Sequence, residues 1–101
     1  MKKLVLSALF LGALASAETM TGWISDSSCG AGNANAQKSS RECTSTCIKG
    51  GASAVFVSDA GQKVYKLSDS AKAAKFLDKK VKVTGKVDGD KIELAAISYA
   101  E

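Results

Sequence analysis

The chain contains no histidine and no proline, and its only aromatic residues are one Trp, two Tyr and three Phe. Without histidine the usual general base at neutral pH is missing, and neither a Ser-His-Asp nor a Cys-His arrangement can form. No internal repeat and no linker interrupt the sequence, so it divides into a single domain only. Because the chain lacks the histidine on which these catalytic arrangements depend, we expect a protein that is not an enzyme.

The amino terminus has the pattern of a secretory signal peptide. Lys2 and Lys3 precede the uncharged run LVLSALFLGALA, and the tripeptide Ala-Ser-Ala at 15–17 supplies the small residues that a signal peptidase needs. A membrane-spanning helix requires about 20 apolar residues, and this run stops sooner, before Glu18. The sequence predicts a signal peptide over 1–17, an exported protein that is periplasmic or secreted, and no membrane anchor after cleavage.

The charge balance excludes one class of partner. The chain has 14 basic and 10 acidic residues, and loss of Lys2 and Lys3 would leave 12 basic residues and a net charge of +2 on 18–101. Proteins that bind single-stranded nucleic acid combine a stronger basic field with several stacking aromatics. We expect a monomeric domain that binds no nucleic acid.

Five segments combine β-branched or aromatic residues with alternating polarity, which predicts strands. They are 19–25, 54–58, 63–67, 81–87 and 91–99. The turn residues at 59–62 and 88–90 should join four of them into two hairpins. In the fourth strand, Val81 and Val83 should point inward, and Lys80 and Lys82 outward.

A short cysteine-bearing helix is predicted between the first two strands. Ser39 and Glu42 fit a capping box, in which each side chain satisfies a free backbone donor at the helix start. The helix would then cover 40–49. Gly50 and Gly51 can adopt the left-handed conformation that ends it.

A second helix of two to three turns is predicted in the segment SDSAKAAKFLDK, between the third and fourth strands. Ser68 or Ser70 would cap it. Its apolar residues Ala73, Phe76 and Leu77 share one face at helical spacing.

This order of elements is that of the OB-fold, a five-stranded barrel with a helix between its third and fourth strands. We predict a mainly β protein with a small, incomplete, five-stranded OB-like barrel. Gly85, inside the fourth strand, favours the sharp coiling of such a barrel. A flat five-stranded meander with both helices on one face is the alternative.

Four segments occur together: GWISDSSCG, ECTSTCIKGGA, VFVSDAGQKVYKL and KKVKVTGKVDGDKIEL. They resemble a family of short exported bacterial proteins of unknown function, whose members read roughly G-x-[IV]-[ST]-D-S-x-C-G, then C-x-x-x-C, and later V-T-G. The resemblance covers 18–101 and implies a fold and a compartment rather than a reaction. Members commonly carry a histidine a few residues after the first cysteine, where this chain has Asn33.

The chemically distinctive residues are Cys29, Cys43 and Cys47. Cys43 and Cys47 share a helix face, but their Cβ atoms would lie about 5–6 Å apart, whereas a disulfide needs about 3.8 Å. We predict a disulfide from Cys29 to Cys47, with Cys29 to Cys43 nearly as favourable, and one free thiol. The protein would then be a small exported binding or structural module without a cofactor, held by this disulfide and acting on an unknown envelope or extracellular ligand.

Two alternatives use the same cysteines. Three thiolates suit Cu(I) or Zn, with a fourth ligand from Asn33, Asp26, water or another chain. A redox role for the thiol left outside the disulfide would need a lowered pKa of that thiol. A nearby cation could lower it, and Arg41 and Lys49 are the only cations close in the sequence. Asp26 lies in the turn sequence Asp-Ser-Ser, which favours a structural role over a catalytic one.

The aromatic residues allow two arrangements. Phe56 and Phe76 are predicted to be core residues. Trp23, Tyr65 and Tyr99 would either form one exposed patch or seal the barrel, and the sequence favours the seal.

Overall fold

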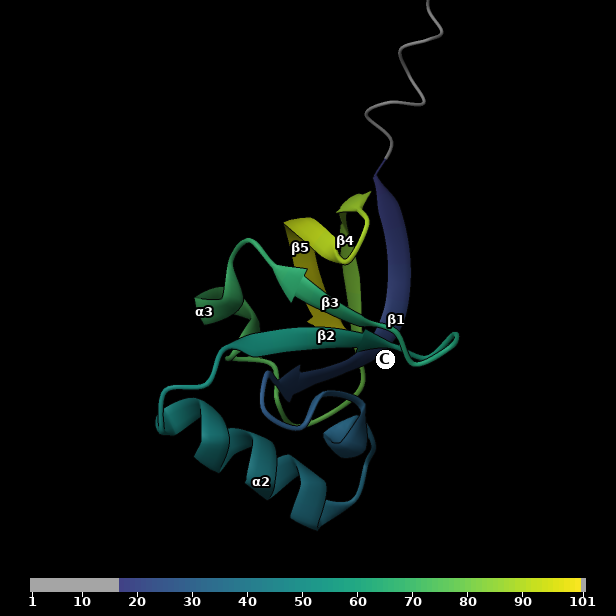
Figure 1. Cartoon of the computed structure of the whole chain (residues 1–101). Helices are drawn as coiled ribbons and strands as arrows, with labels where there is room; N and C mark the ends of the chain where they lie inside the picture. Colours follow the sequence, from purple (N-terminus) through teal and green to yellow (C-terminus); the bar gives the residue numbers. More distant parts are fainter. Residues whose placement is uncertain (1–16, 101) are drawn as a thin grey trace, which may run out of the picture.

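The computed structural model describes residues 17–100, so the predicted signal peptide lies outside the described residues except for Ala17. A closed barrel of five strands forms the body of the molecule, and α2 lies beside one end of it (Figure 1). The elements in chain order are β1 (Glu18–Asp26), η2 (Gly30–Asn33), α2 (Lys38–Lys49), β2 (Ala54–Ser58), β3 (Val64–Leu67), α3 (Ser70–Ala73), β4 (Val81–Asp88) and β5 (Lys91–Tyr99).

The strands neighbour one another in the order β1-β2-β3-β5-β4, and β1 also pairs with β4. All of these pairs are antiparallel except β3 with β5, which is parallel. The OB-like barrel is therefore confirmed, and the flat meander is excluded. The barrel is closed rather than incomplete, because the short β3–β5 ladder joins its two halves.

Two glycines allow the strands to bend into this small barrel. Gly22 stands where β1 changes partner from β4 to β2, and a Cβ atom there would lie 2.0 Å from the carbonyl oxygen of Val57. Gly85 follows a register shift in β4, and its Cβ would lie 2.3 Å from the carbonyl oxygen of Glu93. The role predicted for Gly85 is confirmed, since no larger residue fits so close to the neighbouring backbone.

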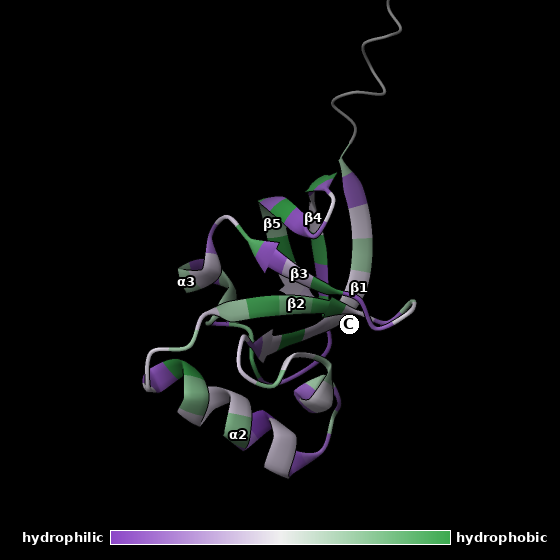
Figure 2. Ribbon diagram, in the orientation of Figure 1, coloured by the Kyte–Doolittle hydropathy of each residue, from purple (hydrophilic) through white to green (hydrophobic). Residues whose placement is uncertain are grey.

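The barrel encloses an apolar core. Val81 and Val83 point inward and are fully buried, whereas Lys80 and Lys82 are exposed, as predicted. Phe56, on β2, is also fully buried. Figure 2 shows hydrophobic residues along β2, β4 and β5, whereas α2 is mostly pale or hydrophilic.

The cysteine-bearing helix begins earlier than the capping box indicated. Its first residue is Lys38, and Gln37 stands at the N-cap without a side-chain hydrogen bond. The prediction that Ser39 and Glu42 cap the helix is therefore wrong. The backbone N–H of Gln37 donates to the Asn35 side chain at 2.9 Å, which turns the chain into the helix before Ser39 is reached. At the other end, Gly51 adopts a positive φ of 113° and Gly50 does not.

The second helix is shorter than predicted. α3 contains a single turn, and its cap is the Asp69 side chain, which accepts a hydrogen bond from the Lys72 backbone at 3.0 Å. Neither Ser68 nor Ser70 caps it, because the Ser68 hydroxyl instead accepts from the backbone N–H of Leu94 in β5 at 3.0 Å. The residues after this turn pack against the barrel core in irregular conformation.

Candidate functional site

The segment 27–50, which contains η2 and α2, forms a unit that we call the cap. Asp26 anchors it at the end of β1, where its carboxylate is fully buried. Asp26 Oδ2 accepts from the backbone N–H groups of Ser28 at 3.1 Å and Cys29 at 2.9 Å. Its Oδ1 accepts from Asn33 Nδ2 at 3.0 Å and Thr44 Oγ1 at 3.4 Å. One side chain thus holds the loop, η2 and α2 together.

These hydrogen bonds decide the charge of Asp26. Burial opposes the ionised form, but donation from the Asn33 side chain and the Cys29 backbone prevails and keeps the pKa of Asp26 below its ordinary value of 3.8. The carboxylate is therefore ionised at neutral pH. Its four donors occupy the lone pairs that a metal ion or a substrate proton would use, which fits the structural role expected for this residue.

Arg41 connects α2 to three other parts of the chain. Its Nη1 donates to the carbonyl oxygens of Ile24 at 3.0 Å and Leu77 at 2.8 Å, and its Nη2 donates to the carbonyl oxygen of Asn33. The guanidinium carbon lies 4.9 Å from the centroid of the Trp23 ring. Arg41 is therefore a buried cross-link between α2, β1, η2 and the segment before β4, and its charge is directed at these carbonyl groups.

The fold brings the three cysteines to the same part of the cap. Cys29 immediately precedes η2, while Cys43 and Cys47 lie one turn apart on α2. No disulfide joins them in this structure; Cys29 and Cys43 are exposed, and Cys47 is half-buried. Cys43 lies nearer the start of α2 and is more exposed than Cys47.

The surroundings of Cys29 and Cys47 oppose the ionisation of their thiols. The charge of Asp26, burial and the nearby Cys43 thiol all raise the pKa of Cys29. Burial, followed by the charge of Asp26 and the thiols of Cys43 and Cys29, raises the pKa of Cys47 to about 11. The side chain of Cys43 lies within hydrogen-bonding reach of both Cys29 and Cys47, which are coupled to each other only through charge.

The direction of these pKa shifts bears on the redox alternative, and the arrangement of side chains bears on the metal alternative. A thiol that exchanges with disulfides needs a lowered pKa, and the pKa values of Cys29 and Cys47 are raised. Across residues 17–100, no group of three or more His, Cys, Asp or Glu side chains is arranged to hold a metal ion. Of the proposed fourth ligands, Asp26 has both oxygens engaged and Asn33 donates its amide to Asp26. Asp26 and Asn33 are thus engaged with each other instead of pointing freely toward the cysteines.

The aromatic residues do not form one exposed patch. Tyr65 is buried in the core, with its ring centroid 6.2 Å from that of Phe56. Trp23 is half-buried beneath the guanidinium described above. Tyr99 is partly exposed and packs edge-on against Phe76 at 5.3 Å. Each ring thus packs against a different neighbour, and Phe76 lies at the margin of the core rather than inside it.

No protein-family model, no curated protein and no solved structure matches this chain. The resemblance to the exported family therefore stays a prediction. Within residues 17–100, no helix combines the length and the apolar character needed to cross a membrane.

Proposed function

We propose that this protein is a small exported binding or structural module, an OB-like barrel whose cap is cross-linked internally by a disulfide between its loop and α2. The observation that carries the proposal is the polar interface of a helix that bears two of three neighbouring cysteines. The residues that α2 buries are Ser40, Arg41 and Thr44, and Ile48 adds one partly buried apolar contact.

A polar interface gives the cap little of the stabilisation that small domains usually obtain from apolar burial. Hydrogen bonds contribute only about 1 kcal/mol each, because they replace hydrogen bonds to water. A covalent link between the loop and the helix is the remaining way to hold the cap. The export signal predicted from the sequence supports a disulfide as this link, since disulfides persist outside the cytoplasm.

The position of Cys43 favours the pair Cys29–Cys43. Cys43 is the thiol within hydrogen-bonding reach of both others, whereas Cys29 and Cys47 are coupled only through charge, and Cys43 shares solvent exposure with Cys29. Cys47 would remain as the free, half-buried thiol. This reverses the slight preference for Cys29–Cys47 that the sequence suggested. In the chain-entropy model, closing a loop of about 15 residues stabilises the folded state by about 3 kcal/mol.

The test is a mass measurement and a thiol count on protein recovered from the cell envelope or the medium after expression of the full chain. The expected mass is that of a chain starting at Glu18, less two hydrogen atoms. Iodoacetamide should modify one cysteine in the denatured, unreduced protein and three after reduction. Prior treatment with a chelator should leave both counts unchanged.

Two results would contradict the proposal. An uncleaved chain retained in the membrane would exclude the exported module. Three modified cysteines without reductant, together with protection of all three by added Cu(I) or Zn, would replace the disulfide with a thiolate metal site.

A further inference from the structure

A groove of about 400 Å³ lies over the outer side of β2 and β3, next to the cap. Its volume lies in the usual range of small-molecule sites, about 300–1,000 Å³. Val55 and Val64 give it apolar surface, and Lys66 is the only charged residue that lines it within the part of the chain that the structure describes. The groove thus combines an apolar lining with one positive charge.

The strand register places this charge on the same face as the apolar lining. Side chains alternate along a strand, so Val64 and Lys66 lie on one face of β3, and Val55 is the direct partner of Lys66 on β2. Tyr65, between the first two, belongs to the barrel core on the other face. Lys66 therefore lies within reach of a ligand that rests on Val55 and Val64.

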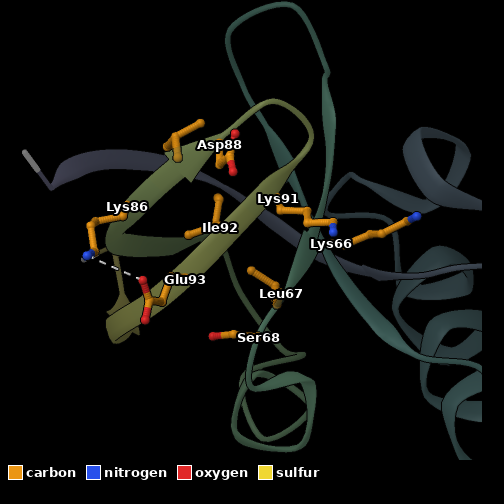
Figure 3. Close-up of a pocket in the computed structure, with 9 residues that line it drawn as sticks. Lys66, Leu67, Ser68, Lys86, Asp88, Lys91, Ile92 and Glu93 are labelled. Carbon is orange, nitrogen blue, oxygen red and sulfur yellow. Dashed lines mark ion pairs between the residues drawn. The ribbon is translucent and has the colours of Figure 1, made fainter. Parts of the chain in front are cut away.

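A second lysine lies beside Lys66 on this face. Lys91 is its direct partner in the parallel β3–β5 ladder, and like charges in neighbouring positions destabilise a sheet. Figure 3 shows a second cleft, partly lined by Ile92, and both lysine side chains extend away from Ile92. Among residues 17–100, neither lysine forms an ion pair. Asp88 is the partner of Lys91 across the hairpin and offsets one of the two charges, so a ligand with a single negative charge would offset the other.

The cap forms one wall of the groove but leaves part of its apolar surface uncovered. Ser27 lines the groove, and a Cβ atom on Gly30 would lie 3.5 Å from Val64 Cγ2. The Ser27 hydroxyl accepts a hydrogen bond from the backbone N–H of Ser53 at 3.1 Å, which leaves its own hydrogen for a further acceptor. Val64 keeps 38% of its surface exposed. Apolar surface is therefore available to a ligand beside Lys66.

We propose that the groove binds a small aliphatic monocarboxylate, with its carboxylate at Lys66 and Lys91 and its apolar chain on Val55 and Val64. This inference rests on the proposed role of the protein as a binding module. The carboxylate would accept charge-assisted hydrogen bonds from the ammonium groups and offset their mutual repulsion. The apolar chain would remove the exposed surface of Val64 from water.

The probe is octanoate, titrated below its micelle concentration into ¹⁵N-labelled protein recovered after export. Its binding should shift the amide signals of 53–55 and 64–66 and leave those of 86–88, in the second cleft, unchanged. Two other probes separate the parts of the ligand, because octyltrimethylammonium has the same chain with a positive charge and acetate has the carboxylate without the chain. Both should bind at least about tenfold more weakly than octanoate.

Lys66→Gln should weaken octanoate binding by at least about tenfold, because it removes a charged donor. The matched control is Lys82→Gln, which removes an exposed lysine of β4 outside the groove and should bind normally. Val64→Thr replaces a methyl group of the lining with a hydroxyl and should weaken binding by about fourfold. Val87→Thr makes the same change in the second cleft and should bind normally. Circular dichroism verifies that all four variants fold.

Equal binding of octyltrimethylammonium or acetate, or no response to octanoate, would overturn the assignment. Signals that shift at 86–88 instead of 53–55, or weakening by Val87→Thr but not by Val64→Thr, would also overturn it, because the ligand would then occupy the second cleft. Equal weakening by Lys66→Gln and Lys82→Gln would reduce the binding to a general attraction by lysines. The mass measurement and the thiol count are independent of these titrations, so a failure of the proposed function is distinguishable from a failure of this inference.

Discussion

The barrel and the cap are stabilised by different interactions. The barrel encloses apolar side chains, of which Ile24, Phe56 and Val83 are fully buried. In the cap and at its anchor the buried side chains are mainly polar, with the Asp26 carboxylate and the Arg41 guanidinium at the centre of their hydrogen bonds. Apolar burial does not depend on protonation, whereas the hydrogen bonds to the Asp26 carboxylate do. The proposed disulfide would make the cap depend on thiol oxidation as well.

This difference predicts a cap that can open while the barrel stays folded. Regions with few apolar contacts generally open at a lower free energy than the core of the same domain. The disulfide and the two charged residues would then set how often the cap opens. The following substitutions test that division, from the largest expected effect to the smallest.

Phe56→Ala should have the largest effect, because it empties the centre of the barrel core. Removal of a buried phenylalanine side chain costs about 3–5 kcal/mol. Urea denaturation should give the same loss in the free energy of unfolding with and without reductant, since the core does not depend on the thiols. A loss that differs by more than about 1 kcal/mol between the two conditions would show that barrel and cap are strongly coupled.

Arg41→Met should destabilise the protein by about 3 kcal/mol, because it leaves buried carbonyl oxygens without donors. Thermal denaturation and limited proteolysis within 27–50 measure the two consequences. Arg41→Lys is the matched control, because it keeps the charge but loses the planar geometry with several donors. Its melting temperature should lie between those of the native protein and Arg41→Met. If Arg41→Met melts like the native protein, the hydrogen bonds of Arg41 do not hold the cap.

Cys29→Ser and Cys43→Ser should each lower stability by about 2–3 kcal/mol, since either change removes the disulfide. For a domain of this size the melting temperature should fall by roughly 8–24 °C. Cys47→Ser, the matched control on the same helix, should change it much less. The opposite ranking, with Cys47→Ser as damaging as Cys29→Ser and Cys43→Ser nearly neutral, would identify Cys29–Cys47 as the bridge.

The smallest expected effect is an acid sensitivity confined to the cap. The pKa of Asp26 is lower in the folded than in the unfolded state, so its ionised carboxylate stabilises the folded protein. This stabilisation is complete above the unfolded pKa of 3.8 and is lost as the pH falls through the folded pKa. Proteolysis of the cap by pepsin should therefore increase below about pH 4 before the barrel unfolds. Asp26→Asn should show faster cleavage with a weaker pH dependence; an unchanged pH dependence would exclude Asp26 as the titrating group.

The barrel was largely predictable because its signals are local. The alternation of Val81 and Val83 with exposed lysines, and the turn residues of both hairpins, identify strands without knowledge of distant contacts. α3 was overestimated because Phe76 and Leu77 have helical spacing but leave the helix to pack against the core. Tertiary packing here overrides the local pattern.

The cap was predictable only in part. The sequence indicated the helix and the importance of the cysteines, yet it gave no sign that Arg41 is buried. Arg41 reaches carbonyl groups 17 and 36 residues away in the chain, and contacts at such separations leave no periodic signal. The pairing of β3 with β5 was missed for the same reason, since Lys66 and Lys91 become neighbours only when the barrel closes.

Hydrogen exchange of the oxidised and the reduced protein, followed by mass spectrometry of peptides, tests the division between cap and barrel most directly. The account predicts that reduction accelerates exchange in peptides covering 38–49 and leaves those covering 54–58 and 81–99 nearly unchanged. Equal acceleration in all peptides, or no change in 38–49, would contradict it, because the cap would then share the stability of the barrel instead of depending on its disulfide.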